Sequence, residues 1–511
     1  MNLPKEVVMG VDSSTQACKV EVRMLDGTLL GQGRSPHPPA FPPSSEQEPA
    51  AWWSAFVRAA RAALEASGVD GSAVVAIGVD AQCHGLVALD SCDAVIRPAK
   101  LWNDTTSASY VAELTKLVGA EAWISSIGSL PTAAFTIGKL AWLAAEEPSH
   151  FARLQTVLLP HDWLTFQLTG KKVTDRSDAS GTGYFEARTG KYRTDYLSLI
   201  DSARDWDRAL PEVLAPNEAA GTILAEVARD LNLNPRALVS AGGGDQHAAA
   251  LGLAVGTGDV VYSLGTSGVV YTSTSDPVFD ASGIVDGVAN MTGGYLPLVS
   301  TLNAARVTDQ FARLLGVDHE GMDQLALHAE PRAESEPVPL VLAAHLDGER
   351  KPNRPAASGI LSGISSRTSR ADVARAAVEG VLLGLQWGEE RLNSAGVATS
   401  GRLVAIGGGA RSRAYLQLLA DLTQRTVHIA DAEEASARGA AVQAAAVATG
   451  QRVADTAQAW APEWVPAAWP REEHLAGAEQ VRRRYAFVAS QNSFDGYPVA
   501  DGIPVAGAGK S

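Results

Sequence analysis

The sequence predicts an α/β protein built from two domains of similar size with a cleft between them, and three observations lead to this prediction. The chain has 511 residues, 46% of them apolar, whereas single hydrophobic cores rarely grow past about 250 to 300 residues. Short apolar strands alternate with amphipathic helices along the chain, a pattern typical of α/β folds. A strand–turn–strand opening near the N-terminus recurs near the middle of the chain.

The first opening spans residues 7–34, where a buried apolar strand, a polar break and two further strands predict an antiparallel meander. Pro49 then opens an amphipathic helix. The apolar side of this helix carries Trp52, Trp53, Phe56, Val57, Ala60 and Leu64. An apolar strand over residues 74–79 follows.

The second opening consists of a strand over 259–264, a tight turn over 265–268 and a return strand over 269–273. This similarity of pattern predicts a duplicated domain start, with the boundary in the glycine-rich step at residues 252–258. We therefore expect a first domain over residues 1–255 and a second over 256–455. Residues 456–511 are expected to form a helical extension that ends in a loosely ordered tail.

Four further elements are predicted in the second half. Ser369 caps a long helix that stops near Gly396. A strand over 402–406 runs into a glycine triplet, and a helix begins around 411–419. A short strand over 427–430 and an alanine-rich helix over 435–447 complete the series.

Composition excludes several classes of function. A net charge of −15 argues against binding to nucleic acid or to an anionic membrane, because both need clustered Lys and Arg. No run of residues approaches the roughly 18 to 20 apolar residues of a membrane span, and residues 1–6 do not resemble a signal peptide. The three cysteines, Cys18, Cys83 and Cys92, form no CxxC pair. A protein of the reducing cytoplasm fits these features best.

Asp12 ends the first buried strand and is followed by Ser13, Ser14, Thr15 and Gln16. Hydroxyl groups and turn amides can donate to phosphate oxygens, so this loop is a candidate nucleotide site in which Asp12 faces a metal ion. The alternative is a polar turn that merely closes a hairpin.

The second turn, Gly265, Thr266 and Ser267 before Gly268, offers backbone amides that can approach a phosphate closely. Two such turns opening two related domains would aim at one cleft from opposite sides. A third element, residues 407–410, could lay the backbone of Gly408, Gly409 and Ala410 against a nucleoside. Its alternative is close packing between a helix and a strand.

Asp245 follows three glycines and precedes a helix of small residues, which leaves its carboxylate open to a ligand. It is the candidate base for accepting a proton from a sugar hydroxyl. The alternative is an aspartate that caps the helix. We interpret His247 as a packing residue, and no nearby acid or second histidine completes a catalytic or metal site around the His161–Asp162 pair.

Two strand ends carry candidate sugar ligands. Cys83 and His84 follow one strand, and Trp102, Asn103 and Asp104 follow another. Ligands bind at such strand ends in open α/β sheets, and a ring face beside amide and carboxylate groups suits a polyol. In the alternative, His84 is a structural histidine, Cys83 a small buried apolar residue, Trp102 a core residue, and the Asn–Asp pair a helix cap.

These segments together resemble the FGGY family of carbohydrate kinases, in the actin-like ATPase superfamily, over about residues 7–450. The motifs that carry the resemblance are DSSTQ at 12–16, GGGDQ at 242–246, SLGTSG at 263–268 and GGGARS at 407–412. The segments CHG at 83–85 and LWND at 101–104 are similar to the xylulokinase branch, which usually has Met where this chain has Cys83.

The resemblance implies two actin-like (ribonuclease-H-like) domains around a central cleft. It also implies that Asp245 is the proton acceptor, that Cys83 and His84 lie against the sugar, and that Asp12 lies near magnesium and phosphate. Thr266 and its glycines would hold the phosphates of ATP, and Gly408, Gly409 and Ala410 would lie along the adenosine. A homodimer is a further family-level expectation.

The expected activity is ATP- and Mg²⁺-dependent phosphorylation of D-xylulose. One alternative is a kinase for another ketose or polyol, such as ribulose or a pentitol. A more remote alternative is a non-catalytic, actin-like ATP switch that binds partner proteins.

Overall fold

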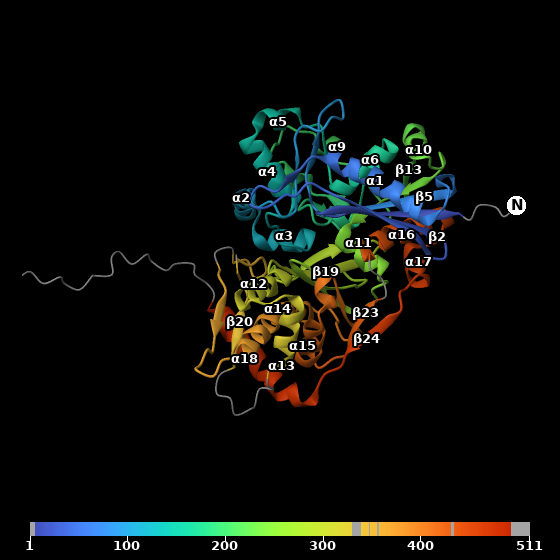
Figure 1. Cartoon of the computed structure of the whole chain (residues 1–511). Coiled ribbons are helices and arrows are strands. Elements are labelled where there is room, and N and C mark those ends of the chain that lie inside the picture. Colours follow the sequence, from blue (N-terminus) through green and yellow to red (C-terminus); the bar gives the residue numbers. More distant parts are fainter. Residues whose placement is uncertain (1–5, 330–338, 347, 355–356, 431–433, 492–511) are drawn as a thin grey trace, which may run out of the picture.

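Two seven-stranded mixed sheets form the centres of the two halves of the molecule, which lie one above the other in Figure 1. The computed structural model describes residues 6–329, 339–346, 348–354, 357–430 and 434–491. Within these ranges, no helix combines the length and the apolar character that a membrane crossing requires.

The first sheet has the strand order β13-β14-β5-β1-β2-β3. Its strands are β1 (Val7–Ser13), β2 (Ala17–Met24), β3 (Leu29–Pro36), β5 (Val74–Ala81), β13 (Ala219–Thr222) and β14 (Leu238–Ser240), with β15 (Gly243–Gly244) beside β5. The predicted meander is confirmed, since β1, β2 and β3 pair antiparallel. The strands β5 and β14 continue the sheet in parallel, and β13 closes it antiparallel.

The second sheet has the order β18-β19-β17-β16-β22-β23-β24. Its strands are β16 (Val260–Leu264), β17 (Gly268–Thr272), β18 (Asp286–Ala289), β19 (Tyr295–Thr301), β22 (Leu403–Ile406), β23 (Val427–Ala430) and β24 (Trp464–Ala468). From β19 to β24 the sequence of antiparallel and parallel pairings matches that from β3 to β13 in the first sheet. The two halves therefore share one topology, as the repeated strand–turn–strand opening indicates.

Helices cover both sheets (Figure 1). Those of the first half are α1 (Pro49–Ser67), α2 (Ala108–Val118), α3 (Ala120–Ile127), α4 (Thr136–Glu146), α5 (Pro148–Arg153), α6 (Pro160–Thr169), α7 (Arg176–Ala179), α8 (Thr194–Leu197), α9 (Trp206–Ala209), α10 (Ala225–Leu231) and α11 (Asp245–Gly252). Those of the second half are α12 (Ala305–Leu315), α13 (His319–His328), α14 (Arg370–Ser394), α15 (Arg413–Thr423), α16 (Ala435–Thr449), α17 (Val453–Ala459) and α18 (Leu475–Ser490).

Local sequence signals place two of these helices. Pro49 is the first residue of α1, whose buried side carries Trp52, Phe56 and Ala60. Ser369 caps α14 by accepting a hydrogen bond from the amide of Asp372, whose carboxylate in turn accepts from the Ser369 amide. This reciprocal pair satisfies two amides that have no partner inside the helix.

Small two-stranded ribbons and a second apolar core complete the first half. Within the described residues, the ribbons of the first half are β4 (Glu46–Gln47) with β7 (Ala99–Lys100), β6 (Val87–Leu89) with β8 (Thr156–Leu158), β9 (Val173–Asp175) with β12 (Glu212–Leu214), and β10 (Phe185–Glu186) with β11 (Lys191–Tyr192). The ribbon of β20 (Val341–Ala343) with β21 (Ile360–Ser362) belongs to the second half. The second core, which includes Trp123, Leu140 and Trp206, lies among the short helices between residues 108 and 209. It forms a helical module beside the first sheet.

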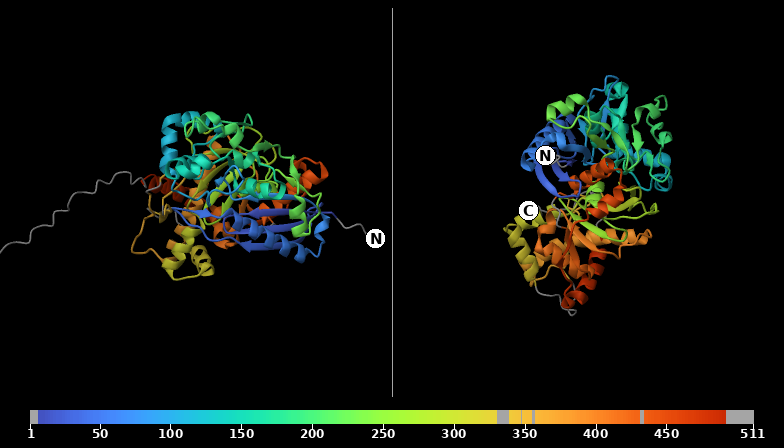
Figure 2. Two further views of the ribbon diagram at one scale, coloured as in Figure 1. Left: turned by 90° about the horizontal axis from the view of Figure 1, so that it is seen from above. Right: turned by 90° about the vertical axis from the view of Figure 1, so that its right-hand side faces the viewer.

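The helix α16 packs against the first sheet, although in the chain it lies between β23 and β24 of the second sheet (Figures 1 and 2). The contact is backbone against backbone, because glycine occupies the facing strand positions. A methyl group on Gly10 would lie 2.0 Å from the Ala437 carbonyl oxygen, and one on Gly78 would lie 2.0 Å from the Ala440 carbonyl oxygen. The helix also meets α11 closely, since a methyl group on Gly439 would lie 1.8 Å from the Ala248 carbonyl oxygen.

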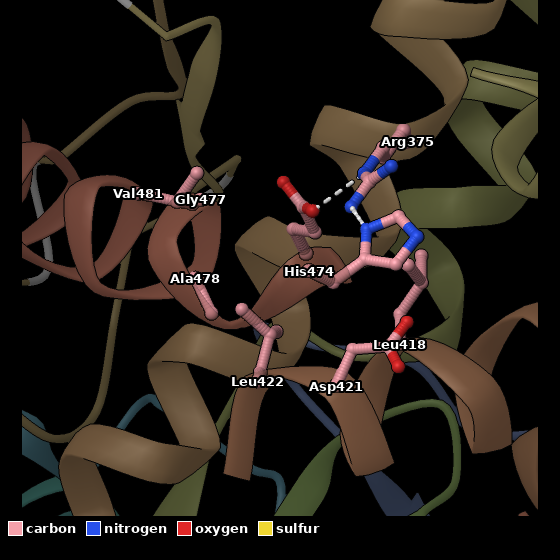
Figure 3. A pocket seen from close by; sticks show the side chains of 9 residues that line it. Arg375, Leu418, Asp421, Leu422, His474, Gly477, Ala478 and Val481 are labelled. Carbon is pink, nitrogen blue, oxygen red and sulfur yellow. Dashed lines mark hydrogen bonds and ion pairs between the residues drawn. The ribbon is translucent and has the colours of Figure 1, made fainter. Parts of the chain in front are cut away.

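The C-terminal segment completes the second half instead of forming only a helical extension. The strand β24 pairs antiparallel with β23 at the edge of the second sheet. Beyond it, α18 covers α14 and α15, and a small pocket remains between them (Figure 3). There Arg375 bonds Glu379 at 2.7 Å and donates to Nδ1 of His474 at 3.1 Å. The tail expected beyond residue 491 lies outside the described residues.

Replacing Gly10 by Ala should destabilise the protein by about 1–3 kcal/mol or more, the usual cost of overpacking a tight contact. The added methyl group would have to push α16 away from the sheet. Thermal or urea denaturation measures the change. Gly256→Ala is the matched control, because its methyl group would meet only the carboxylate of Asp259, at 3.3 Å. Equal stability of the two variants would contradict this interpretation of the α16 contact.

Candidate active site

Three carboxylates lie at the carboxyl ends of neighbouring strands of the first sheet. Asp12 near the end of β1 and Asp80 near the end of β5 are partners in the register of these parallel strands. The strand β15 runs beside β5 with Gly243 opposite Asp80, and Asp245 follows it directly as the first residue of α11. The fold thus brings Asp245 near Asp80 and Asp12, although it follows them in the sequence by 165 and 233 residues.

Asp12 is buried and held by its own loop and by a lysine. The Ser14 hydroxyl donates to its Oδ1, and Lys19 Nζ lies 3.6 Å from its Oδ2. Lys19 also bonds Glu434, the residue before α16, at 2.6 Å. Burial raises the pKa of Asp12, although the charge of Lys19 partly offsets this effect.

Asp80 was missed in the sequence analysis. It is completely buried, and no amide or hydroxyl group of the described residues donates to either of its oxygens. Burial and the neighbouring Asp12 and Asp245 raise its pKa well above the usual value. A signal was available, because the tripeptide Gly-Val-Asp occurs near the end of both strands, at residues 10–12 and 78–80.

The Asp12–Asp80 pair fits a hard divalent cation. Mg²⁺ prefers oxygen ligands and is usually held by one or two carboxylates. Two buried carboxyl groups with raised pKa values, one of them without a donor, gain a compensating charge when such a cation binds. These residues would therefore hold the ion directly or through water.

Asp245 does not cap α11, because the cap residue is Gly244 and Asp245 already belongs to the helix. Its Oδ1 accepts hydrogen bonds from the Cys83 thiol, at 3.3 Å, and from the Gln246 amide, at 2.8 Å. Burial and the charge of Asp12 raise its pKa to about 7. A carboxylate with this pKa can accept a proton near neutral pH.

His84 is held in a rare conformation beside Asp245. Its φ of 60° lies in the left-handed region, which side chains other than glycine seldom adopt. Its amide donates to Asp178 Oδ1 at 3.1 Å, and its ring Nδ1 lies 2.8 Å from the same oxygen. The ring stacks on Phe135 with centroids 5.7 Å apart, and Gly181 leaves space for it. This backbone is strained but firmly held, as is common at ligand sites.

Trp102 connects the two halves. Its indole Nε1 donates to the Thr15 hydroxyl at 2.9 Å, so the ring lies against the Asp12 loop. The guanidinium of Arg350, from the second half, lies 5.2 Å from the centre of the same ring. Gln16, in contrast, is exposed. Sequence reasoning missed Arg350, because only the folded chain brings it to the site.

Asp104 is a structural residue, which corrects its expected role as a sugar ligand. Its carboxylate is completely buried and accepts hydrogen bonds from the Ser45 amide, from Lys100 and from the amide and hydroxyl of Thr106. No acceptor position remains for a sugar hydroxyl. The half-buried Asn103 differs, since its buried side-chain oxygen has no hydrogen-bond partner.

The two candidate phosphate segments of the second half lie against each other. Gly265, Thr266 and Ser267 form the turn between β16 and β17, with Thr266 exposed. Residues 408–411 form one 3-10 turn after β22, which runs parallel to β16. A methyl group on Gly409 would lie 2.7 Å from Leu264 Cβ, whereas one on Gly408 would meet nothing within 4 Å. Gly409 therefore serves packing, and the open face is at Gly408.

His161 has acidic neighbours, contrary to the sequence analysis. Its Nε2 lies 3.1 Å from Asp162, 3.5 Å from Asp175 and 3.7 Å from Asp178. The chain brings these acids together from two segments, and only Asp162 is adjacent in sequence. All four side chains are buried, and Asp178 links this group to His84.

The comparisons with known proteins identify the class. The model of the FGGY carbohydrate-kinase N-terminal domain matches residues 7–252, and that of the C-terminal domain matches residues 260–448. The chain therefore belongs to the FGGY family of carbohydrate kinases, and it is a phosphotransferase of the two-domain, actin-like fold.

Several individual members of this family are similar to the chain over most of its length. The xylulose kinase of Streptomyces coelicolor is 39% identical over 456 residues, which cover 89% of this chain and 90% of that protein. The xylulose kinase of Streptomyces rubiginosus is 38% identical over 488 residues, which cover 95% and 96%. The crystal structure of xylulose kinase from Bifidobacterium adolescentis superimposes with a TM-score of 0.80 at 34% identity, covering 95% of this chain and 99% of that one.

Replacing Asp80 by Asn should stabilise the protein at pH 8, because burial and the neighbouring Asp12 and Asp245 raise the pKa of the Asp80 carboxyl group well above its usual value. A folded-state pKa above the unfolded value lowers stability once the pH exceeds the unfolded pKa, and the amide removes that charge. Chemical denaturation at pH 5 and pH 8 tests this, with a larger gain expected at pH 8. Catalytic activity should fall, because a cation ligand is lost. A stability loss at pH 8 would show that the charge of Asp80 is compensated.

Proposed function

We propose that this kinase transfers the γ-phosphoryl group of ATP to D-xylulose and forms D-xylulose 5-phosphate. Asp245 is the observation that carries the proposal, because it is a half-buried carboxylate with a pKa of about 7 beside two candidate sugar contacts. The names and coverage of the Streptomyces relatives support the choice of sugar.

In the proposed reaction, Asp245 accepts a hydrogen bond from the 5-hydroxyl of the sugar and orients its oxygen toward the γ-phosphorus. A sugar hydroxyl is a weak acid, so the proton moves to the carboxylate late, as the phosphoryl group is transferred. Cys83 and His84 contact the sugar, and Trp102 and Asn103 line the site. Asp178 keeps the His84 ring and backbone in position.

The second half is proposed to bind the nucleotide. The amides of residues 265–267 and the Thr266 hydroxyl donate to phosphate oxygens, Gly408 and its neighbours lie along the adenosine, and Ser14 and Thr15 approach from the first half. Magnesium, when bound at Asp12, neutralises charge on the phosphates. Arg350 adds a positive charge near this region from the second half.

Closure of the two halves would exclude water, which otherwise competes with the sugar hydroxyl for ATP. Trp102 contacts Thr15 of the first half and Arg350 of the second, so a movement of one half relative to the other would change these contacts. A homodimer in the cytoplasm remains our expectation for the assembly, and size-exclusion chromatography with light scattering measures it.

Replacing Asp245 by Ala or Asn should lower kcat by about 10²- to 10⁴-fold, the usual contribution of a general base, while ATP binding persists. ADP release is measured with D-xylulose, D-ribulose, L-ribulose, glycerol, xylitol and no sugar. The control Asp230→Asn changes an exposed acid and should behave like the unmodified protein. Retained activity would remove Asp245 from the base role, and preference for ribulose or a pentitol would change the proposed substrate.

The pH dependence of kcat/KM should show an ascending limb with a midpoint near pH 7. The base must be ionised, and the pKa of Asp245 is raised to about 7, so the rate should fall as the pH drops below that value. Steady-state measurements between pH 5 and pH 9 give the profile. A rate that stays constant down to pH 5 would show that no group with this pKa governs the reaction.

A further inference from the structure

A sulfur, an imidazole and a carboxylate converge beside the proposed base. The atoms that Cys83, His84 and Asp178 offer as ligands all lie within 4.8 Å of one another. The first two residues follow β5, whereas Asp178 belongs to the short helix α7. The cluster is therefore produced by the fold and could not be read from local spacing.

Two further groups face the same sulfur. Asp245 Oδ1 lies 3.3 Å and His247 Nδ1 lies 3.9 Å from Cys83 Sγ. Glycine at position 244 leaves space for the Cys83 and His247 side chains, because a methyl group there would lie 2.4 Å from Cys83 Sγ and 2.8 Å from His247 Nδ1. A fourth ligand position is thus available to an ion held by the first three residues.

One buried carboxylate oxygen of the cluster lacks a hydrogen-bond donor. Asp178 is completely buried, and its Oδ2 has no hydrogen-bond partner among the described residues, with the imidazole of His161 3.7 Å away. Buried polar atoms normally have partners, so this oxygen is available to a ligand.

The chemistry of the donors selects the kind of ion. Thiolate and imidazole ligands favour Zn²⁺ and similar soft or borderline cations, whereas Mg²⁺ prefers oxygen ligands. Asp178 supplies a carboxylate to the cluster, which favours a cation over an anion. This donor set differs from the Asp12–Asp80 pair, which offers oxygen alone.

We propose that Cys83, His84 and Asp178 form a binding site for a thiophilic divalent cation such as Zn²⁺, and that the bound cation blocks the sugar site. Binding forms a bond between Cys83 Sγ and the metal, and the thiol proton leaves to water. The cation then occupies the space beside Asp245. The blocking effect rests on the proposed function, whereas the binding itself does not.

The direct test uses the untagged full-length protein without nucleotide or magnesium. Zn²⁺ binding is measured by competition with a chromophoric chelator, and Co²⁺ binding by its absorption. We expect one tight site per chain and a thiolate-to-cobalt charge-transfer band. Cys83→Ser should remove the band and weaken Zn²⁺ binding by at least about tenfold, since even loss of an outer partner costs about 10- to 100-fold. Unchanged Zn²⁺ affinity in that variant would overturn the proposal.

Cys92→Ser is the matched control, because Cys92 is exposed and lies outside the cluster. It should bind Zn²⁺ like the unmodified protein. A measurement on the unmodified chain guards against misfolding of the Cys83 variant. Zn²⁺ should slow alkylation of Cys83 by iodoacetamide, mapped by mass spectrometry, at least about tenfold more than alkylation of Cys92. Equal protection of both cysteines would overturn the site.

Competition with the sugar tests the block. Zn²⁺ should raise the KM for whichever sugar the activity panel selects, without a matching rise in the KM for ATP, and the sugar should weaken Zn²⁺ binding. If no sugar in the panel is phosphorylated, the spectroscopic and alkylation results still decide whether the metal site exists. Zn²⁺ binding that the active sugar does not affect would overturn the claim that the two ligands share the space beside Asp245.

Discussion

The contact between α16 and the first sheet is the constraint on which the arrangement of the site depends. It requires strands without side chains at Gly10 and Gly78, because the helix backbone occupies the space of a methyl group at both positions. These glycines lie two residues before Asp12 and Asp80. The same helix reaches the site at its start, where the Ser436 hydroxyl donates to the Asp245 backbone oxygen at 3.0 Å. Close packing and placement of the carboxylates are thus two results of one contact.

The grouping of acids has an electrostatic cost. Asp12 and Asp80 are buried, Asp245 beside them is half-buried, and each of the three has a raised pKa. Charged groups in such surroundings destabilise the folded state unless a cation or a proton compensates them. Under the proposed function, the raised pKa of Asp245 makes it a stronger base than a carboxylate in open solvent, at a cost in folding stability.

Much of the fold could be predicted from local patterns, because alternation, caps and glycine turns act over a few residues. The strand over 427–430 and the cap at Ser369 are examples that the structure confirms. The strand β24 was not predicted because Pro466 interrupts it, and proline is tolerated there only because the strand lies at the sheet edge. At the site, motifs indicated Asp12, Cys83, His84 and Asp245, but the neighbours Asp178 and Arg350 come from distant segments. Asp104 was misassigned because a short polar segment after a strand looks alike whether it binds ligand or caps a helix.

The shared topology of the two sheets makes their strand ends directly comparable. In the first half, the parallel strands β1 and β5 carry Asp12 and Asp80 one residue before their ends. In the second half, β16 and β22 end in Leu264 and Ile406 and are followed by glycine. One topology thus presents acids, which suit a cation, at one set of strand ends, and glycine turns, which leave backbone amides accessible, at the other.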